Sequence, residues 1–139
     1  MPPAVSGRRG ASTGWWRWAV VAAYLSFIYL LSSQPSLPEL PGAPSDKLEH
    51  VAAYGLMSAL VVWARVRGDW RTVTVRTVVF AAVFCTLYGW SDELHQYFVP
   101  PRQYDLRDLA ADGAGALLAA GALWAWGIIA RGRTPSHDM

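Results

Sequence analysis

Three short polar segments hold most of the residues in this chain that could carry chemistry. In the first, DKLEHVAAY, Asp46, His50 and Tyr54 recur at intervals of four, and Lys47 lies three residues before His50. Side chains with this spacing share one face of a helix. A carboxylate, an ammonium group and an imidazole on one face can bind an anion or exchange a proton.

The other two segments are rich in carboxylates. SDELHQYF contains Asp92, Glu93 and Gln96, of which the first and last are helical neighbours. RQYDLRDLAADGAG contains a cationic residue followed by three acids that share a helix face, namely Arg102, Asp105, Asp108 and Asp112. Carboxylate oxygens suit a hard divalent cation, and a guanidinium offers two parallel donors to a phosphate.

Several of these residues also have a purely structural interpretation. Asp46 and Asp105 fall at expected helix starts, where a carboxylate complements the helix dipole. Asp112 lies about two turns inside its segment, at roughly 1.5 Å per residue, too deep to reach the interface easily. His95 falls off the face shared by Asp92 and Gln96.

The glycines of the last segment are expected to serve helix packing. Gly113, Gly115 and Gly121 are small enough to let neighbouring helices approach closely. Ala111, Gly115 and Ala119 form a row of small residues at intervals of four, which is typical of such contacts.

The elements that must position these side chains are predicted from composition. The chain has 53% hydrophobic and 16% charged residues, with eight Trp among 139 residues, a balance typical of membrane proteins. Four apolar segments are long enough to cross a bilayer as helices, at 15–31, 48–64, 73–90 and 106–130. We therefore predict an all-α integral membrane bundle of four transmembrane helices. The first segment also resembles a signal peptide, but no A-x-A cleavage pattern follows it.

The distribution of charge predicts how this bundle is oriented. Nine of the twelve Lys and Arg residues fall on one side of the predicted membrane: seven lie before the first span, between the second and third, or after the fourth, and Arg17 and Arg76 lie near the same side within the first and third spans. By the positive-inside rule these parts, with both termini, are cytoplasmic. The domain prediction is a flexible cytoplasmic N-terminus (1–14), a membrane domain (15–131) and a flexible cytoplasmic tail (132–139).

Eight of the ten acids fall on the opposite side, so the three polar segments are expected to meet at the extracytoplasmic face. A carboxylate facing lipid at the helix centre costs at least about 2.5 kcal/mol, so the polar stripes should point inward. The cytoplasmic halves of the second and fourth spans, MSALVVWA and LLAAGALWAWGII, contain no ionisable residue. The cluster should therefore open to one side only, which argues against transport through a single chain.

The three segments together resemble the VanZ-like family of bacterial membrane proteins. That family is marked by D-K-x-x-H-x-x-x-Y, D-E-x-x-Q and R-x-x-D-x-x-D-x-x-x-[ND]-x-x-G, and the resemblance covers about residues 24–130. Many relatives have Asn where this chain has Asp112, and Pro101 replaces a glycine often found before the arginine. The resemblance implies a role in the cell envelope, and the family's namesake is associated with resistance to the glycopeptide antibiotic teicoplanin.

Two functional hypotheses remain open. In the first, the cluster binds or modifies a lipid-linked or phosphorylated envelope precursor, with a divalent cation held by Asp92, Glu93, Asp105 and Asp108 as a possible cofactor. The expected catalytic residues are His50, Asp92, Glu93 and Asp108; the expected substrate-binding residues are Lys47, Tyr54, Gln96 and Arg102; Asp46, Asp105 and Asp112 complete a polar network. No G-x-S-x-G or H-E-x-x-H motif is present, so the sequence does not decide whether the protein is an enzyme.

In the second hypothesis the charges form a non-catalytic network that fixes the bundle or binds an ion or proton. The lipid bilayer is the expected partner in both cases. Nucleic acid is not expected, because the arginines are spread over three segments and are better explained as topology determinants.

Overall fold

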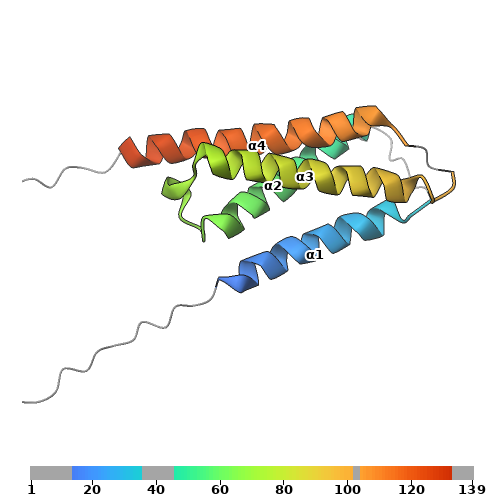
Figure 1. Cartoon of the computed structure of the whole chain (residues 1–139), viewed down its shortest axis with the longest axis horizontal. Coiled ribbons are helices and arrows are strands. Elements are labelled where there is room, and N and C mark those ends of the chain that lie inside the picture. The colour runs from blue at the N-terminus through green and yellow to red at the C-terminus, as the bar shows by residue number, and fades with distance from the viewer. Residues whose placement is uncertain (1–13, 36–45, 102–103, 133–139) are drawn as a thin grey trace, which may run out of the picture.

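The computed structural model describes residues 14–35, 46–101 and 104–132, and this part of the chain contains helices and no strand (Figure 1). The four α-helices are α1 (Trp15–Ser32), α2 (Asp46–Arg65), α3 (Val75–Gln96) and α4 (Leu106–Gly132), with a short 3-10 helix, η1 (Trp70–Thr72), before α3. The all-α prediction is confirmed for these residues. The segments 1–13 and 133–139, which include most of the predicted flexible ends, lie outside the described residues.

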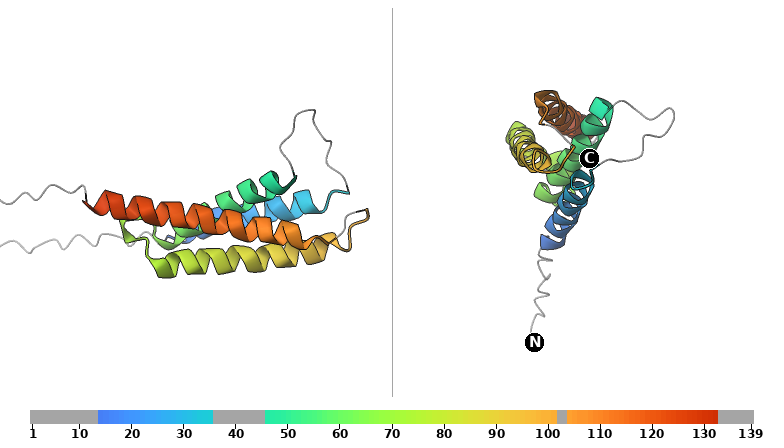
Figure 2. Two further views of the ribbon diagram at one scale, coloured as in Figure 1. Left: turned by 90° about the horizontal axis from the view of Figure 1, so that it is seen from above. Right: turned by 90° about the vertical axis from the view of Figure 1, so that its right-hand side faces the viewer.

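Successive helices run in opposite directions and pack side by side (Figures 1 and 2). α4 packs along both α2 and α3, and α1 lies mainly against α2. At one end of the bundle α1 and α3 finish while α2 and α4 begin; we call it the acidic end because it contains Asp46, Asp92 and Asp105. We call the other end the arginine end, because Arg65, at the end of α2, and Arg76, at the start of α3, lie there.

Helix α3 extends further than its predicted apolar span. The span was expected to end near Trp90, but the helix continues to Gln96. Two interactions account for the extra turns: Gln96 donates to the Asp92 carboxylate one turn earlier, and Asp92 and Glu93 are buried against other helices. The DELHQ motif is therefore helical, and the connection to α4 is shorter than expected.

The connection between α2 and α3 is fixed by local hydrogen bonds. Gly68, with a φ of +83°, ends α2 by donating its N–H to the carbonyl of Trp63. Thr74 and Thr77 form a reciprocal cap at the start of α3. These bonds hold the arginine end of the bundle in a defined shape.

The tightest helix contact joins α2 and α4 at a glycine. A Cβ atom added to Gly115 would lie 2.3 Å from the carbonyl oxygen of Val51, so only glycine fits there. Nearby, the Ser58 hydroxyl donates to the carbonyl of Ala116 over 2.8 Å, and Ala116 is fully buried. The packing role predicted for Gly115 is confirmed. It is wrong for Gly121, because no atom of another helix in the described part of the chain lies within 4 Å of a Cβ built there.

Tyrosine hydroxyls tie α1 to the rest of the bundle. Tyr24 donates to the carbonyl of Ala53 on α2 over 3.0 Å, and Tyr88 on α3 donates to the carbonyl of Leu25 over 2.6 Å. Both bonds involve adjacent residues in the middle of α1, so they fix this part of the helix against α2 and α3 without any charged group.

Apolar side chains cover much of the outer surface of the bundle. Large exposed examples occur on all four helices, including Leu30, Leu56, Leu87 and Leu118. Among the described residues one helix, α4, qualifies by length and composition as a candidate membrane span. The four-span topology therefore stays a prediction.

The contact at Gly115 provides a test of the packing. We expect Gly115→Ala to destabilise the protein by about 1–3 kcal/mol, the usual cost of overpacking, because the added methyl group would overlap the Val51 backbone. The matched control is Gly121→Ala, which should be neutral or slightly stabilising since alanine favours helix more than glycine does. Thermal unfolding in detergent micelles measures both. Equal melting temperatures for the two variants would contradict this account of the α2–α4 contact.

Candidate functional site

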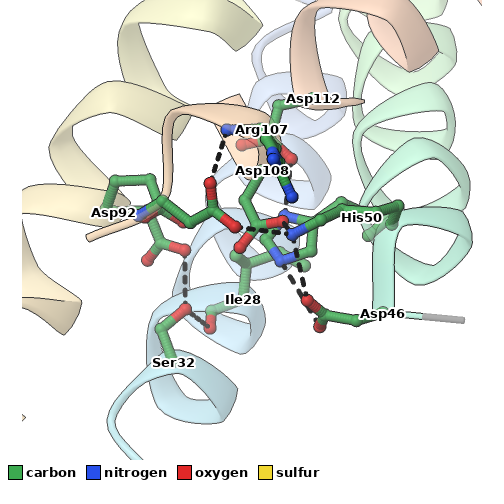
Figure 3. A network of polar contacts seen from close by, with 12 residues as sticks. Ile28, Ser32, Asp46, His50, Asp92, Arg107, Asp108 and Asp112 are labelled. Atoms are coloured by element: carbon green, nitrogen blue, oxygen red, sulfur yellow. Dashed lines mark hydrogen bonds and ion pairs between the residues drawn. The ribbon is translucent and has the colours of Figure 1, made fainter. Parts of the chain in front are cut away.

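Side chains from all four helices meet at the acidic end (Figure 3). The carboxylates point inward as predicted: the exposed fractions are 5% for Asp92, 1% for Glu93, 8% for Asp108 and 1% for Asp112. Such groups are costly to bury unless donors surround them. The identity of those donors therefore determines what the site can do.

Lys47 is the central cation of the cluster. Its ammonium group forms ion pairs with Asp108, with Asp105 at 3.0 Å and with Asp46 at 3.4 Å. The Asp108 carboxylate, and after it the Asp105 carboxylate, hold the pKa of Lys47 well above its ordinary value. Lys47 thus remains charged at any physiological pH and links the start of α2 to the start of α4.

Asp105 both starts α4 and contacts the other helices. Its Oδ1 accepts from the backbone N–H of Arg107 over 2.8 Å, as an N-terminal capping residue does. Its own backbone N–H donates to Oε2 of Glu93 on α3 over 3.1 Å. The Arg107 N–H, followed by the Lys47 ammonium, lowers the pKa of Asp105. The structural interpretation of Asp105 as a helix-start residue is thus confirmed, alongside its pairing with Lys47.

A histidine and a buried aspartate form the second pair. His50 Nδ1 lies 2.8 Å from Oδ1 of Asp112, while its Nε2 lies 4.0 Å from Oδ1 of the exposed Asp46. A carboxylate only accepts, so Nδ1 carries the hydrogen and Nε2 is left with a lone pair when the ring is neutral. Because Nε2 faces an exposed side chain, the pair has the arrangement of a proton acceptor oriented by a buried acid.

Asp92 links α3 to α1. Its Oδ2 accepts from the Ser32 hydroxyl over 2.7 Å (Figure 3). The same oxygen accepts from Nε2 of Gln96 over 3.2 Å. Ser32 is 5% exposed and also donates to the carbonyl of Ile28. The sequence analysis missed Ser32, because a single serine near the end of an apolar helix carries no pattern that marks it.

Three buried carboxylate oxygens have no hydrogen-bond partner among the described residues. They are Oδ1 of Asp92, Oε1 of Glu93 and Oδ2 of Asp112. The hydroxyl of Tyr54 is likewise buried and unpaired within this part of the chain. Each of these carboxylates can therefore accept a further donor.

The remaining predicted residues lie at different depths. Tyr54 is 2% exposed, and its ring lies nearly parallel to that of His50 with centroids 6.4 Å apart. His95 lies apart from Asp92, as expected, with its ring stacked on Tyr29 at 4.5 Å and its Nε2 3.0 Å from the Ser33 hydroxyl. Arg102, the predicted phosphate-binding arginine, lies outside the described residues.

The residues that could hold a metal differ from those expected. The sequence pointed to Asp92, Glu93, Asp105 and Asp108, whereas the described part of the structure groups Asp46, His50 and Asp108, with ligand atoms all within 4.8 Å of one another. A histidine nitrogen with two carboxylates suits Zn²⁺ better than Mg²⁺. Lys47 contacts both of these carboxylates and already supplies a positive charge there. The donor set therefore fits a cation only if Lys47 moves away.

These features define a helical protein with an apolar outer surface and a charged site, built by all four helices, at one end. Residues 23–129 match the VanZ/LLP1 family, and the chain belongs to it. The predicted resemblance is thereby confirmed, and the family supports a membrane-associated protein of the resistance type. No curated protein and no solved structure matches the chain.

The pairing of Lys47 can be measured by double-mutant cycles. We expect Lys47→Gln and Asp108→Asn to be strongly coupled, within the roughly 0.5–3 kcal/mol typical of contacting residues, because Asp108 is nearly buried. The matched cycle pairs Lys47→Gln with Asp46→Asn, whose side chain is 69% exposed, and its coupling should be smaller. Unfolding in detergent micelles gives both values. A larger coupling for Asp46 would contradict the central role of the Lys47–Asp108 contact.

Proposed function

We propose that the protein is a four-span cell-membrane protein whose acidic end faces outward and binds or modifies a lipid-linked or phosphorylated envelope precursor. The observation that supports this proposal most directly is the combination of a charged lysine and a histidine oriented by an aspartate at one end of the bundle. Lys47 supplies the charge that attracts a phosphate, and His50 supplies the site for a proton.

Two features support a bilayer position across all four helices. Large apolar side chains are exposed on each helix, which suits contact with lipid rather than water. Charged residues concentrate at the two ends, and the arginine end matches the positive side of a membrane protein. On this proposal both termini are cytoplasmic and the acidic end is extracytoplasmic.

Binding of a phosphate would begin at Lys47. The ammonium group is half-exposed, so an incoming phosphate can compete with Asp105 and Asp46 for it. Arg102, three residues before Asp105 in the sequence, would add a two-pronged donor for the phosphate. Tyr54 and Gln96 are buried and would contact a ligand only after the entrance opens.

Proton transfer is assigned to His50. Nε2 accepts a proton from a hydroxyl group of the ligand or from a water molecule next to it. The Asp112 carboxylate then stabilises the positive charge that the imidazole ring acquires. Asp108, Asp92 and Glu93 complete the proposed acidic set. Asp108 positions Lys47, while Asp92 and Glu93 hold α1, α3 and the start of α4 together. A Zn²⁺ held by Asp46, His50 and Asp108 would be an alternative to this arrangement, because it would displace Lys47 and use His50 as a ligand instead of a proton acceptor, and it would polarise the bound precursor.

The proposed physiological result is a contribution to glycopeptide resistance of the teicoplanin type. Such antibiotics act on cell-wall precursors outside the membrane. A site at the extracytoplasmic face that binds or alters a precursor would change how much antibiotic target is available there.

The alternative function is a non-catalytic charged network that fixes the bundle or holds an ion or proton. It is favoured by the number of internal contacts: Lys47 pairs with three aspartates, and Asp92 accepts from two other helix positions. Under this alternative, substitution of any member of the network would lower the folded yield, and any change in envelope phenotype would result from that loss.

The topology is testable with single cysteines in a Cys85→Ala background. Tyr97→Cys lies just beyond α3 at the acidic end, and Arg71→Cys lies in η1 at the arginine end; both positions are exposed. We expect a membrane-impermeant maleimide to label Tyr97→Cys in intact cells and Arg71→Cys only after permeabilisation. Labelling of both positions from outside, or the reverse pattern, would reject the proposed topology.

The two functions separate in a comparison of histidine variants. We expect His50→Gln to lower teicoplanin resistance to that of cells without the gene while the folded yield stays unchanged, because glutamine cannot carry the proton. The matched control is His95→Gln, which removes a histidine of the same end that contacts Ser33 and Tyr29 instead, and it should retain resistance. Loss of folded yield in His50→Gln would favour the structural network. Equal resistance in cells with the wild type, His50→Gln or His95→Gln would favour it as well.

A further inference from the structure

A groove of about 590 Å³ runs along the outer face of α3 at the arginine end, away from the polar cluster. Two rows of side chains four residues apart form it. The first row consists of Val75, Val79, Val83 and Leu87, each more than half exposed. The second consists of Arg76, Phe80 and Phe84. Rows with this spacing follow one helix face and leave a shallow channel between them.

The groove is charged at one end only. Arg65, the last residue of α2, places its guanidinium 4.2 Å from the centroid of the Phe80 ring. Arg76 lies one helical turn before Phe80, at the start of α3. Among the described residues neither guanidinium forms an ion pair with a carboxylate. Two unpaired cations thus lie at the end of a channel that is otherwise apolar.

This pattern matches the chemistry of one class of partner. A phospholipid with a net negative headgroup has an anion at one end and a flexible apolar chain at the other. From Val75 to Leu87 the helix rises about 18 Å, at about 1.5 Å per residue. One leaflet of hydrocarbon is about 15 Å deep, half of the roughly 30 Å core. The groove therefore has the length of one acyl chain with its phosphate at the arginines.

We propose that this groove is a binding site for an anionic phospholipid of the leaflet at the arginine end. The phosphate lies between Arg65 and Arg76, and an acyl chain lies along Val79, Val83 and Leu87. The site rests on the proposed membrane position of α3, but not on the chemistry of His50 or on which side of the membrane faces outward. A protein partner fits the groove less well, because it would need acidic groups opposite the arginines and would leave the apolar channel empty.

The test is lipid retention by the purified full chain in detergent, measured by native mass spectrometry. The probes are phosphatidylglycerol and phosphatidylcholine with identical acyl chains. We expect the wild type to prefer phosphatidylglycerol by about 30-fold, because each of the two arginines should raise the affinity for an anionic lipid about fivefold and the two factors multiply. Arg65→Gln with Arg76→Gln should lose this preference. The control pair, Arg71→Gln with Arg131→Gln, removes two exposed arginines of the same end that do not line the groove and should keep it.

Two further arms address the apolar part and the fold. Val79→Phe with Val83→Phe fills the channel with both arginines intact and should release the bound lipid. Arg65→Lys with Arg76→Lys keeps the charge and should keep most of the preference, which provides a folded reference if the glutamine pair misfolds. Equal retention of the two lipids by the wild type, equal losses in the groove and control pairs, or retention in the filled variant would overturn the proposal. Displacement of phosphatidylglycerol by inorganic phosphate alone would also overturn it, since that result indicates a simple anion site.

Discussion

The close approach of α2 and α4 at Gly115 is the constraint on which the rest of the site depends. The backbone of Val51 on α2 lies so close to Gly115 on α4 that no side chain fits between them. His50 directly precedes Val51, and Asp112 lies one turn before Gly115, so the backbone contact sets the 2.8 Å separation of their side chains. Lys47 and Asp108 lie one turn further toward the same end and meet for the same reason. A larger residue at Gly115 would separate both pairs together, because rigid helices transmit a displacement along their length.

The second constraint is the cost of burying acids. Four carboxylates are at most 8% exposed, and each one has at least one protein donor: Lys47 for Asp108, His50 for Asp112, Ser32 for Asp92 and a backbone N–H for Glu93. These donors come from α1, α2 and the start of α4, so satisfying the acids requires all the helix ends to meet. The acids therefore determine the shape of the acidic end as much as apolar packing determines the middle of the bundle.

Hydropathy and helical spacing predicted the parts of this structure that depend on one helix at a time. The four helices begin and end within a few residues of the apolar segments, except where α3 continues through Asp92 and Gln96. The inward direction of the carboxylates also followed from spacing and from the cost of placing charge in lipid. Pairings between helices could not be predicted this way. Nothing in the sequence distinguishes Asp108 from Asp112 as the partner of Lys47, or marks Ser32 as the donor to Asp92, because these choices depend on helix rotation and offset. The same limit explains Gly121, which has the spacing of a packing glycine but faces away from the neighbouring helices.

The choice of aspartate at position 112 has a chemical consequence of its own. The resembling family pattern admits either Asn or Asp there, and either side chain could hold an imidazole by one oxygen. An amide can also turn its N–H₂ group toward the ring, so it does not fix which nitrogen carries the hydrogen. A carboxylate has no donor, so it holds the hydrogen on Nδ1 and leaves Nε2 directed toward the exposed Asp46. Its charge also stabilises an imidazolium, which an amide does far less well. On the proposed function, Asp112 therefore directs proton acceptance to Nε2 of His50, and this fixed orientation is what distinguishes an acid–base pair from a hydrogen bond that only holds two helices together.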